Sequence, residues 1–217
     1  MTHSEENYLK AIYHLTVQLE AEVPTNAIAE MMETKASSVT DMLKKLADKA
    51  LINYIKYQGV SLTEKGTHAA KMIVRKHRLW EVFLVEKLAF TWDEVHDIAE
   101  QLEHIKSEQL INKLDDFLDN PTEDPHGDPI PDAQGKITKI EKLLLSELAE
   151  SETAICVGVK DSSADFLQYL NKQKIALGAV IKVLGRENFD ASLHLIINDT
   201  PLTVSSKIAG NLYVKRI

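Results

Sequence analysis

The residues best suited to chemistry are imidazole and carboxylate side chains in the middle of the sequence. His96, Glu100, Glu103 and His104 follow one another at i, i+4, i+7 and i+8. In a helix, that spacing puts all four on one face. Imidazole nitrogens and carboxylate oxygens gathered in this way can bind a divalent cation. If the same cluster were buried without a cation, its uncompensated charge would be costly.

A second pair of the same chemistry lies upstream. His77 and Glu81 are four positions apart and belong to the preceding predicted helix. A single pair of this kind is usually a surface hydrogen bond, but two such faces together can enclose a cation. Asp124 and His126 lie in a proline-rich segment, where they are either ordinary loop residues or ligands that close a site from the side.

Hydrophobic periodicity predicts the elements that must position these residues. A first helix is expected over residues 4–19, with Ser4 as its N-cap. A long helix is expected over 63–88 and a further helical stretch over 92–118, broken once near 106–107. Residues 120–131 are rich in proline, cannot continue a helix and are predicted to form a loop.

The N-terminal third has the element order of a winged helix-turn-helix. A short helix from Thr25 and a third helix from about 36 precede strands at 51–55 and 60–62, which flank a hairpin turn. Any three-helix bundle shows such periodicity, but the tight turn and the hairpin favour DNA binding. The third helix is then the recognition helix. The expected DNA contacts are Lys35, Ser37, Ser38, Thr40, Asp41, Lys44 and Lys45, with Lys56 in the wing.

The charge distribution agrees with DNA binding in the N-terminal third and cation binding in the middle of the chain. The net charge of -8 over 217 residues argues at first against a nucleic-acid partner. Local fields matter more, however, and lysines are frequent between residues 35 and 56, whereas acids concentrate between 94 and 132. A basic front and an acidic middle fit DNA at one end and cations in the middle, although solvated helix faces would show the same charges.

The last third changes from helical to strand-like patterning. Short β-branched runs occur at 155–159, 180–184, 193–197 and 212–214, and a short helix is expected over 161–170. Several short strands in so short a segment predict a small β-barrel.

The sequence lacks the motifs that are typical of several other classes of protein. The single cysteine, Cys156, excludes an intrachain disulfide and is expected to be a packed core thiol. Export and membrane-spanning segments are not apparent, so a soluble cytoplasmic protein is expected. Glu103 and His104 lack the second histidine of a zinc-protease motif, and neither a nucleophile elbow nor a phosphate-binding glycine loop occurs. We therefore expect no enzyme, with a metal-dependent hydrolase as the alternative from another class.

Taken together, these motifs resemble the diphtheria-toxin-repressor and manganese-transport-regulator family of bacterial metalloregulators. The resemblance extends along essentially the whole chain. It implies a mainly α protein with a small β part: a winged helix-turn-helix domain over 1–72, a metal-binding and dimerisation domain with a proline-rich linker over 73–135, and an SH3-like, FeoA-type domain over 136–217. The segments that carry it are 5–13, 36–40, 62–66, 75–81, 96–104 and 125–131.

The resemblance also implies two metal sites per subunit. By position, the primary site falls on Asn7, Glu100, Glu103 and His104. The ancillary site falls on His77, Glu81 and His96, with His126 from the loop and Asp165 from the barrel.

Three positions of the implied sites carry information about the metal. Glu100 stands where iron-responsive relatives have a cysteine, and a set of carboxylates and imidazoles favours Mn²⁺ while remaining compatible with Fe²⁺. Asn7 stands where an aspartate or methionine is usual and offers only a neutral amide oxygen. Lys10 stands where manganese regulators without the barrel have a glutamate, which disfavours their paired-metal arrangement.

The implied function is metal-dependent transcriptional repression in metal-ion homeostasis. A metal that joins the first helix to residues 100–104 would fix the DNA-binding domain of a homodimer. Its two recognition helices would then meet successive major grooves of a palindromic operator, about 34 Å apart. A DNA-binding regulator whose metals are purely structural is the alternative reading.

Overall fold

The computed structural model describes residues 1–55, 58–138 and 141–217. Within these ranges, no helix is both long enough and apolar enough to cross a membrane. Contacts divide the chain into two compact units. The first unit comprises Met1–His77, Glu100–Asn112 and Pro131–Lys136, and the second comprises Arg78–Ala99, Lys113–Ile130 and Ile137–Ile217.

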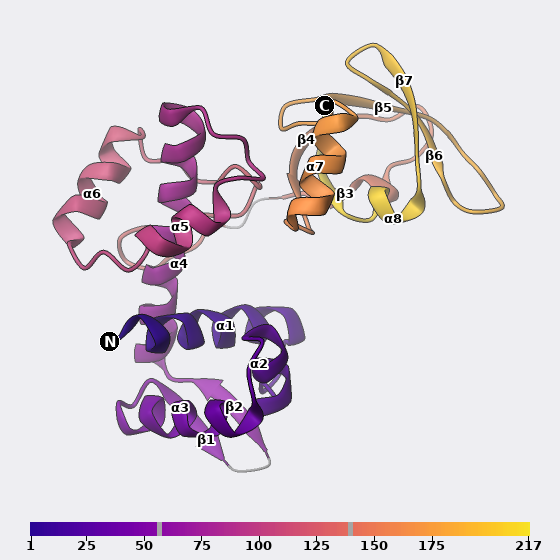
Figure 1. The fold of residues 1–217 in the computed structure, drawn as a ribbon. Coiled ribbons are helices and arrows are strands. Elements are labelled where there is room, and N and C mark those ends of the chain that lie inside the picture. The colour runs from indigo at the N-terminus through magenta and orange to yellow at the C-terminus, as the bar shows by residue number, and fades with distance from the viewer. Residues whose placement is uncertain (56–57, 139–140) are drawn as a thin grey trace. The chain divides into compact units, whose positions relative to one another are not determined.

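The first unit contains the predicted winged helix-turn-helix (Figure 1). The strands of its hairpin pair antiparallel, with Ile52 opposite Leu62. Residues with apolar side chains from all three helices and the hairpin, among them Leu9, Ile28 and Leu43, form one buried core. The elements are α1 (His3–Leu19), α2 (Thr25–Met31), α3 (Ala36–Asp48), β1 (Ile52–Ile55) and β2 (Gly59–Leu62).

The start of α1 differs from the prediction. Its N-cap is Thr2 and not Ser4, because the Thr2 hydroxyl accepts a hydrogen bond from the Glu5 amide while the Glu5 carboxylate accepts one from the Thr2 amide. This reciprocal capping box satisfies two amides that the helix itself leaves unpaired. The capping box also fixes the start of α1, where Glu6 and Asn7 come directly after Glu5.

The middle of the chain forms three helices. α4 (Glu64–Leu88) agrees with the expected long helix. The expected stretch over 92–118 divides into α5 (His96–Leu102) and α6 (Glu108–Phe117). Glu103 and His104 consequently lie in the turn that ends α5 and not on the helix itself, which corrects the assumption that one helical face carries all four residues.

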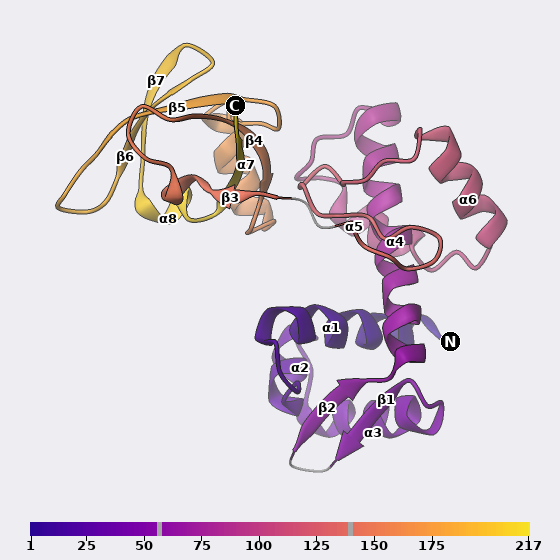
Figure 2. The same ribbon diagram turned by 180° about the vertical axis from the view of Figure 1, so that it is seen from behind.

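The second unit contains a six-stranded antiparallel sheet with the order β3-β8-β4-β5-β6-β7. The four predicted strands are present, and β3 and β7 are additional. Leu167 and Leu170 of α7 lie in the same buried core as the sheet residues, and Figures 1 and 2 show α7 beside the sheet from both sides. The strands are β3 (Leu143–Leu144), β4 (Thr153–Val159), β5 (Val180–Arg186), β6 (Leu193–Ile197), β7 (Thr200–Val204) and β8 (Leu212–Arg216), with α7 (Ala164–Lys172) and α8 (Ser206–Ala209).

The proline-rich loop is attached to β4 by a close backbone contact. The Val159 amide donates a hydrogen bond to the His126 carbonyl at 2.9 Å. A Cβ atom on Gly158 would lie 2.6 Å from that carbonyl oxygen, and one on Gly127 would lie 2.0 Å from the Val157 oxygen. Since real Cβ atoms do not approach other atoms so closely, glycine at both positions is what allows the loop to lie on the strand.

We therefore expect Gly158→Ala to lower the free energy of unfolding by about 2 kcal/mol, because the added methyl group must displace backbone. Gly185→Ala is the matched control. Gly185 also lies at a register shift between sheet strands, but a Cβ there meets nothing within 4 Å. Denaturant unfolding monitored by tryptophan fluorescence measures both. An equal decrease in the free energy of unfolding of the two variants would show that the close contact at Gly158 does not contribute to stability.

Candidate metal centres and nucleic-acid interface

Glu103 is the centre of the first set of candidate ligands. Its side chain is fully buried. One oxygen, Oε2, accepts a hydrogen bond from Lys10 Nζ at 2.8 Å and another from His77 Nδ1 at 2.7 Å. Burial alone would raise the pKa of Glu103, but the hydrogen bond from His77 and the charge of Lys10 outweigh it and hold the pKa below its usual value. Glu103 is therefore a buried carboxylate that stays charged.

Among the described residues of the first unit, two buried side-chain oxygen atoms have no hydrogen-bond partner. They are Glu103 Oε1 and Asn7 Oδ1, the latter on α1. Buried polar atoms are nearly always paired, because leaving one unpaired costs roughly 1–3 kcal/mol. A divalent cation accepts lone pairs from carboxylate and amide oxygens alike, so each of these two atoms is chemically suited to bind a metal.

His104 is oriented by a carboxylate from α1. Its Nδ1 donates a hydrogen bond to Glu6 Oε2 at 2.6 Å, and its ring stacks on His3 with centroids 4.3 Å apart. The lone pair of the neutral ring is then on Nε2. A carboxylate behind the imidazole is the usual arrangement for metal-binding histidines, since it fixes both the tautomer and the ring plane.

Glu100 is held less tightly than Glu103. Its Oε1 accepts a hydrogen bond from Lys10 Nζ at 3.1 Å, and its side chain is 44% exposed. Among the described residues, the ligand atoms of Glu100, Glu103 and His104 do not all come within 4.8 Å of one another. The first set is therefore partly assembled, with the Lys10 ammonium between its two carboxylates.

A second set is more compact and lies in the second unit. Ligand atoms of Glu81, Asp124 and His126 all come within 4.8 Å of one another, and all three residues are buried. Burial, reinforced by the charge of Glu81, raises the pKa of Asp124 to about 6. Burial lowers the pKa of His126, but attraction to Glu81 and Asp124 outweighs it and raises the value to about 9. Neighbouring groups that shift one another's pKa in this way are common at binding and catalytic sites.

His126 presents a defined nitrogen to this set. Its Nε2 lies 2.8 Å from the Trp92 carbonyl oxygen, which can only accept, so Nε2 carries a proton. Nδ1 lies 3.6 Å from Glu81 Oε2 and 3.9 Å from Asp124 Oδ1. When the ring is neutral, its lone pair therefore faces the two carboxylates, as metal binding requires.

The remaining predicted ligands are His77, His96 and Asp165. His96 Nδ1 lies 3.6 Å from Glu81 Oε1, although the His96 side chain is 56% exposed. His77 precedes Glu81 by one turn of α4. Asp165 is exposed in the first turn of α7 and belongs to neither cluster of potential ligands among the described residues. Asp124, by contrast, joins the second set, and its place beside His126 in the proline-rich loop was the available sequence signal.

The predicted DNA-binding residues lie along the outer side of α3. Thr40 is half-buried and its hydroxyl donates to the Ala36 carbonyl at 3.0 Å. Lys44 lies 3.3 Å from Asp41 in an exposed ion pair. Lys56 lies outside the described residues. The exposed members of the set are Lys35, Ser37, Ser38, Asp41, Lys44 and Lys45.

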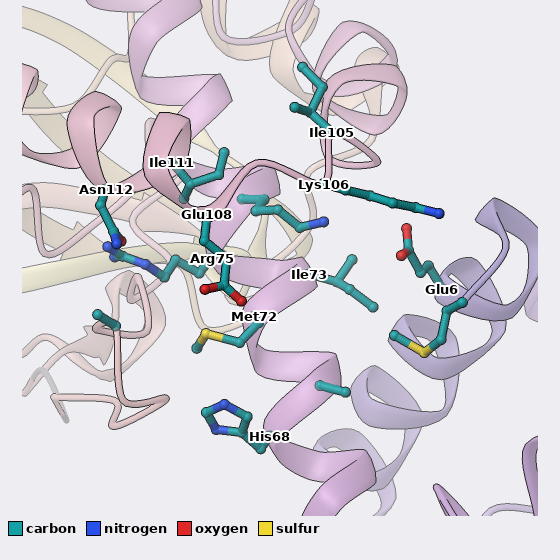
Figure 3. A pocket seen from close by; sticks show the side chains of 14 residues that line it. Glu6, His68, Met72, Ile73, Arg75, Ile105, Lys106, Glu108, Ile111 and Asn112 are labelled. Carbon is teal, nitrogen blue, oxygen red and sulfur yellow. The ribbon is translucent and has the colours of Figure 1, made fainter. Parts of the chain in front are cut away.

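A cavity of about 530 Å³ also lies in the first unit. Figure 3 shows His68 and Met72 on α4 along one side of it and Glu6 on α1. Lys76 also lines it, and burial lowers the pKa of that amine. Because Glu6 is the partner of His104, the cavity borders the first set of ligands.

Comparisons with protein families cover nearly the whole chain. Residues 1–60 match the iron dependent repressor, N-terminal DNA binding domain. Residues 63–132 match the iron dependent repressor, metal binding and dimerisation domain, and residues 143–216 match the FeoA domain.

Individual relatives agree with the family matches. The chain is 36% identical over 132 residues to the iron-dependent repressor IdeR of Mycobacterium tuberculosis, covering 60% of this chain and 56% of that protein. It is 34% identical over 117 residues to the transcriptional regulator MntR of Oceanobacillus iheyensis, covering 54% of this chain and 78% of that protein.

Solved structures extend the likeness to all of the chain. A manganese-dependent transcriptional repressor in complex with manganese has a TM-score of 0.83 and 33% identity, with 98% of this chain and 100% of that chain covered. The manganese regulator SloR has a TM-score of 0.75 and 32% identity, with both chains covered completely. The chain therefore belongs to the diphtheria-toxin-repressor and manganese-transport-regulator family of metal-dependent transcriptional repressors.

Proposed function

We propose that this protein is a homodimeric repressor whose binding to a palindromic operator is activated by Mn²⁺, with Fe²⁺ as the second candidate effector. The observation that carries the proposal is the pair of buried, unpartnered oxygens on Asn7 and Glu103. They belong to α1 and to the turn after α5, so a metal bound by both joins the DNA-binding helices to the metal-binding segment. Asn7, Glu100, Glu103 and His104 are its ligands.

The preference for Mn²⁺ follows from the donor atoms. The proposed ligands supply oxygen and nitrogen but no thiolate, and such sets favour harder cations. Cys156 is not an alternative ligand, because burial raises the pKa of its thiol to about 11 and it lies inside β4. Likeness to a manganese-dependent repressor over its full length supports the same metal.

The second set provides an ancillary position. Glu81, Asp124 and His126 are buried together and combine two carboxylates with one oriented imidazole. His96 lies within reach of Glu81, and His77 is one helical turn from it on α4. Asp165 stays in the proposal through the family resemblance alone. A metal here would neutralise carboxylates that attract a proton onto His126.

The DNA surface is proposed on α3. The N-cap residue Lys35 makes no side-chain hydrogen bond to the first turn, and the Ser38 amide already donates to the Lys35 carbonyl, so the amides of Ala36 and Ser37 and the exposed Ser37 and Ser38 side chains are the groups offered to phosphate oxygens. Lys35, Lys44, Lys45 and Lys56 add positive charge, and Thr40 and Asp41 complete the set. Apolar side chains exposed on the second unit, including Leu88 and Phe117, provide surface for the homodimer contact.

The proposed coupling between metal binding and DNA binding is tested by replacing the carboxylate of Glu103. Glu103→Ala and the shape-conserving Glu103→Gln should both abolish the activation of DNA binding by Mn²⁺, so that a coupling factor of roughly 5–150 falls to about one. Fluorescence anisotropy on a palindromic operator candidate at fixed salt measures this factor. Glu20→Gln, an exposed change at the residue that follows α1, is the control.

Circular dichroism verifies that both Glu103 variants remain folded. Wild-type activation in folded Glu103→Gln would remove this residue from the mechanism. Equal DNA binding by the wild-type protein with Mn²⁺ and with chelator would make the metals structural.

The ancillary set should bind metal more tightly as pH rises. The pKa of His126, about 9 against an ordinary 6.5, means that its protonation stabilises the fold below pH 6.5 and that this contribution is lost as pH rises through 9. A metal must displace the same proton, so Mn²⁺ affinity should increase by about tenfold per pH unit between pH 6.5 and 8.5.

Calorimetric titration in the Glu103→Gln background isolates this set from the primary one. His126→Gln should remove the pH dependence, and His194→Gln should retain it, because His194 is an exposed histidine paired with Glu187. A pH-independent affinity in the protein with His126 intact would contradict the assignment.

A further inference from the structure

Lys10 is a buried cation among the proposed metal ligands. It projects from α1, its side chain is 11% exposed, and its Nζ lies 2.8 Å from Glu103 Oε2 and 3.1 Å from Glu100 Oε1. Lysine is almost never this buried unless it is paired. The ammonium therefore binds both carboxylates at once.

This arrangement differs from the other lysine ion pairs of the first unit. The Lys44–Asp41 pair has side chains that are 64% and 72% exposed, and in the Lys49–Glu5 pair the lysine is 47% exposed although the glutamate is only 7% exposed. Solvent screens such pairs and reduces their influence. Lys10 acts in a buried environment, where charges interact more strongly.

A divalent cation at the primary set needs the same two carboxylates. If the metal takes Glu100 Oε1 or Glu103 Oε2, the hydrogen bonds from Lys10 must weaken or break. If it takes Glu103 Oε1 and Asn7 Oδ1 instead, it lies close to a like charge on the other oxygen of the same carboxyl group. In both cases, binding costs an interaction with Lys10 that exists before the metal arrives.

We propose that Lys10 is a built-in competitor of the activating metal and sets the concentration at which the repressor responds. This inference rests on the proposed function of the primary set. The ammonium connects α1 to the end of α5, the same two segments that the metal joins, but with one positive charge instead of two. It thereby holds the carboxylates of the site together before a metal binds and lowers the affinity of that site for the divalent ion.

The test is the metal affinity of Lys10→Met, which keeps the length of the side chain and removes its charge. Calorimetric titration of the full chain with Mn²⁺ should give a dissociation constant at least about tenfold lower than that of the wild-type protein. Without metal, the variant should melt at a lower temperature, because Glu103 and Glu100 lose their cation. Saturating Mn²⁺ should remove most of this difference.

Two matched variants separate competition from general effects. Lys49→Met makes the same change in charge at a lysine of the same unit that is 47% exposed and whose ion pair with Glu5 includes neither Glu100 nor Glu103, and it should leave the Mn²⁺ affinity within about threefold of wild type. Lys10→Arg keeps the charge and should retain an affinity close to that of the wild-type protein.

Unchanged or weaker Mn²⁺ binding by folded Lys10→Met would overturn the inference and leave Lys10 as a structural partner of Glu103. A tenfold gain in Lys49→Met as well would reduce the effect to net charge and equally refute a specific role. Failure of the wild-type protein to bind Mn²⁺ would instead refute the proposed function, so the two failures are distinguishable.

Discussion

A carboxylate with no solvent exposure constrains the first unit more than any other group. Glu103 remains charged although it is fully buried, and a buried charge destabilises a fold by several kcal/mol unless cations or donors surround it. Lys10 reaches it from α1 and His77 from α4, so a single charge draws three segments together. An apolar side chain would cost less, which is why this residue is better explained by binding than by stability.

Periodicity predicted the longer helices and most strands because it reports burial within one element. It placed the break in 92–118 only approximately, since the turn at Glu103 depends on contacts with α1 and α4. Two strands escaped prediction for local reasons, and the four-residue helix α8 was not predicted either. Leu143–Leu144 is too short to show alternation, and Thr200–Val204 contains Pro201, which is tolerated because β7 is an edge strand.

The candidate ligands were predictable as residue types at helical spacing, but their partners were not. Spacing indicated that His77, Glu81 and Glu103 carry metal chemistry. It could not indicate that Glu6 orients His104 across 98 positions, or that Lys10 binds Glu103 across 93. Asp124 could be named from the sequence as a loop residue able to close a site, but its contact with Glu81 arises from tertiary folding and was not predictable. Contacts between distant segments leave no periodic signal in a single sequence.

The backbone contact between Gly127 and Gly158 makes the ancillary ligands depend on the C-terminal sheet. It lays the loop that carries His126 on a strand of the C-terminal sheet, with the Val159 amide bonded to the His126 carbonyl. The ancillary ligands are thus supported by a domain that contributes none of Glu81, Asp124 or His126. A shorter descendant that lost this sheet would keep Asn7 and Glu103 but would leave the loop without its scaffold.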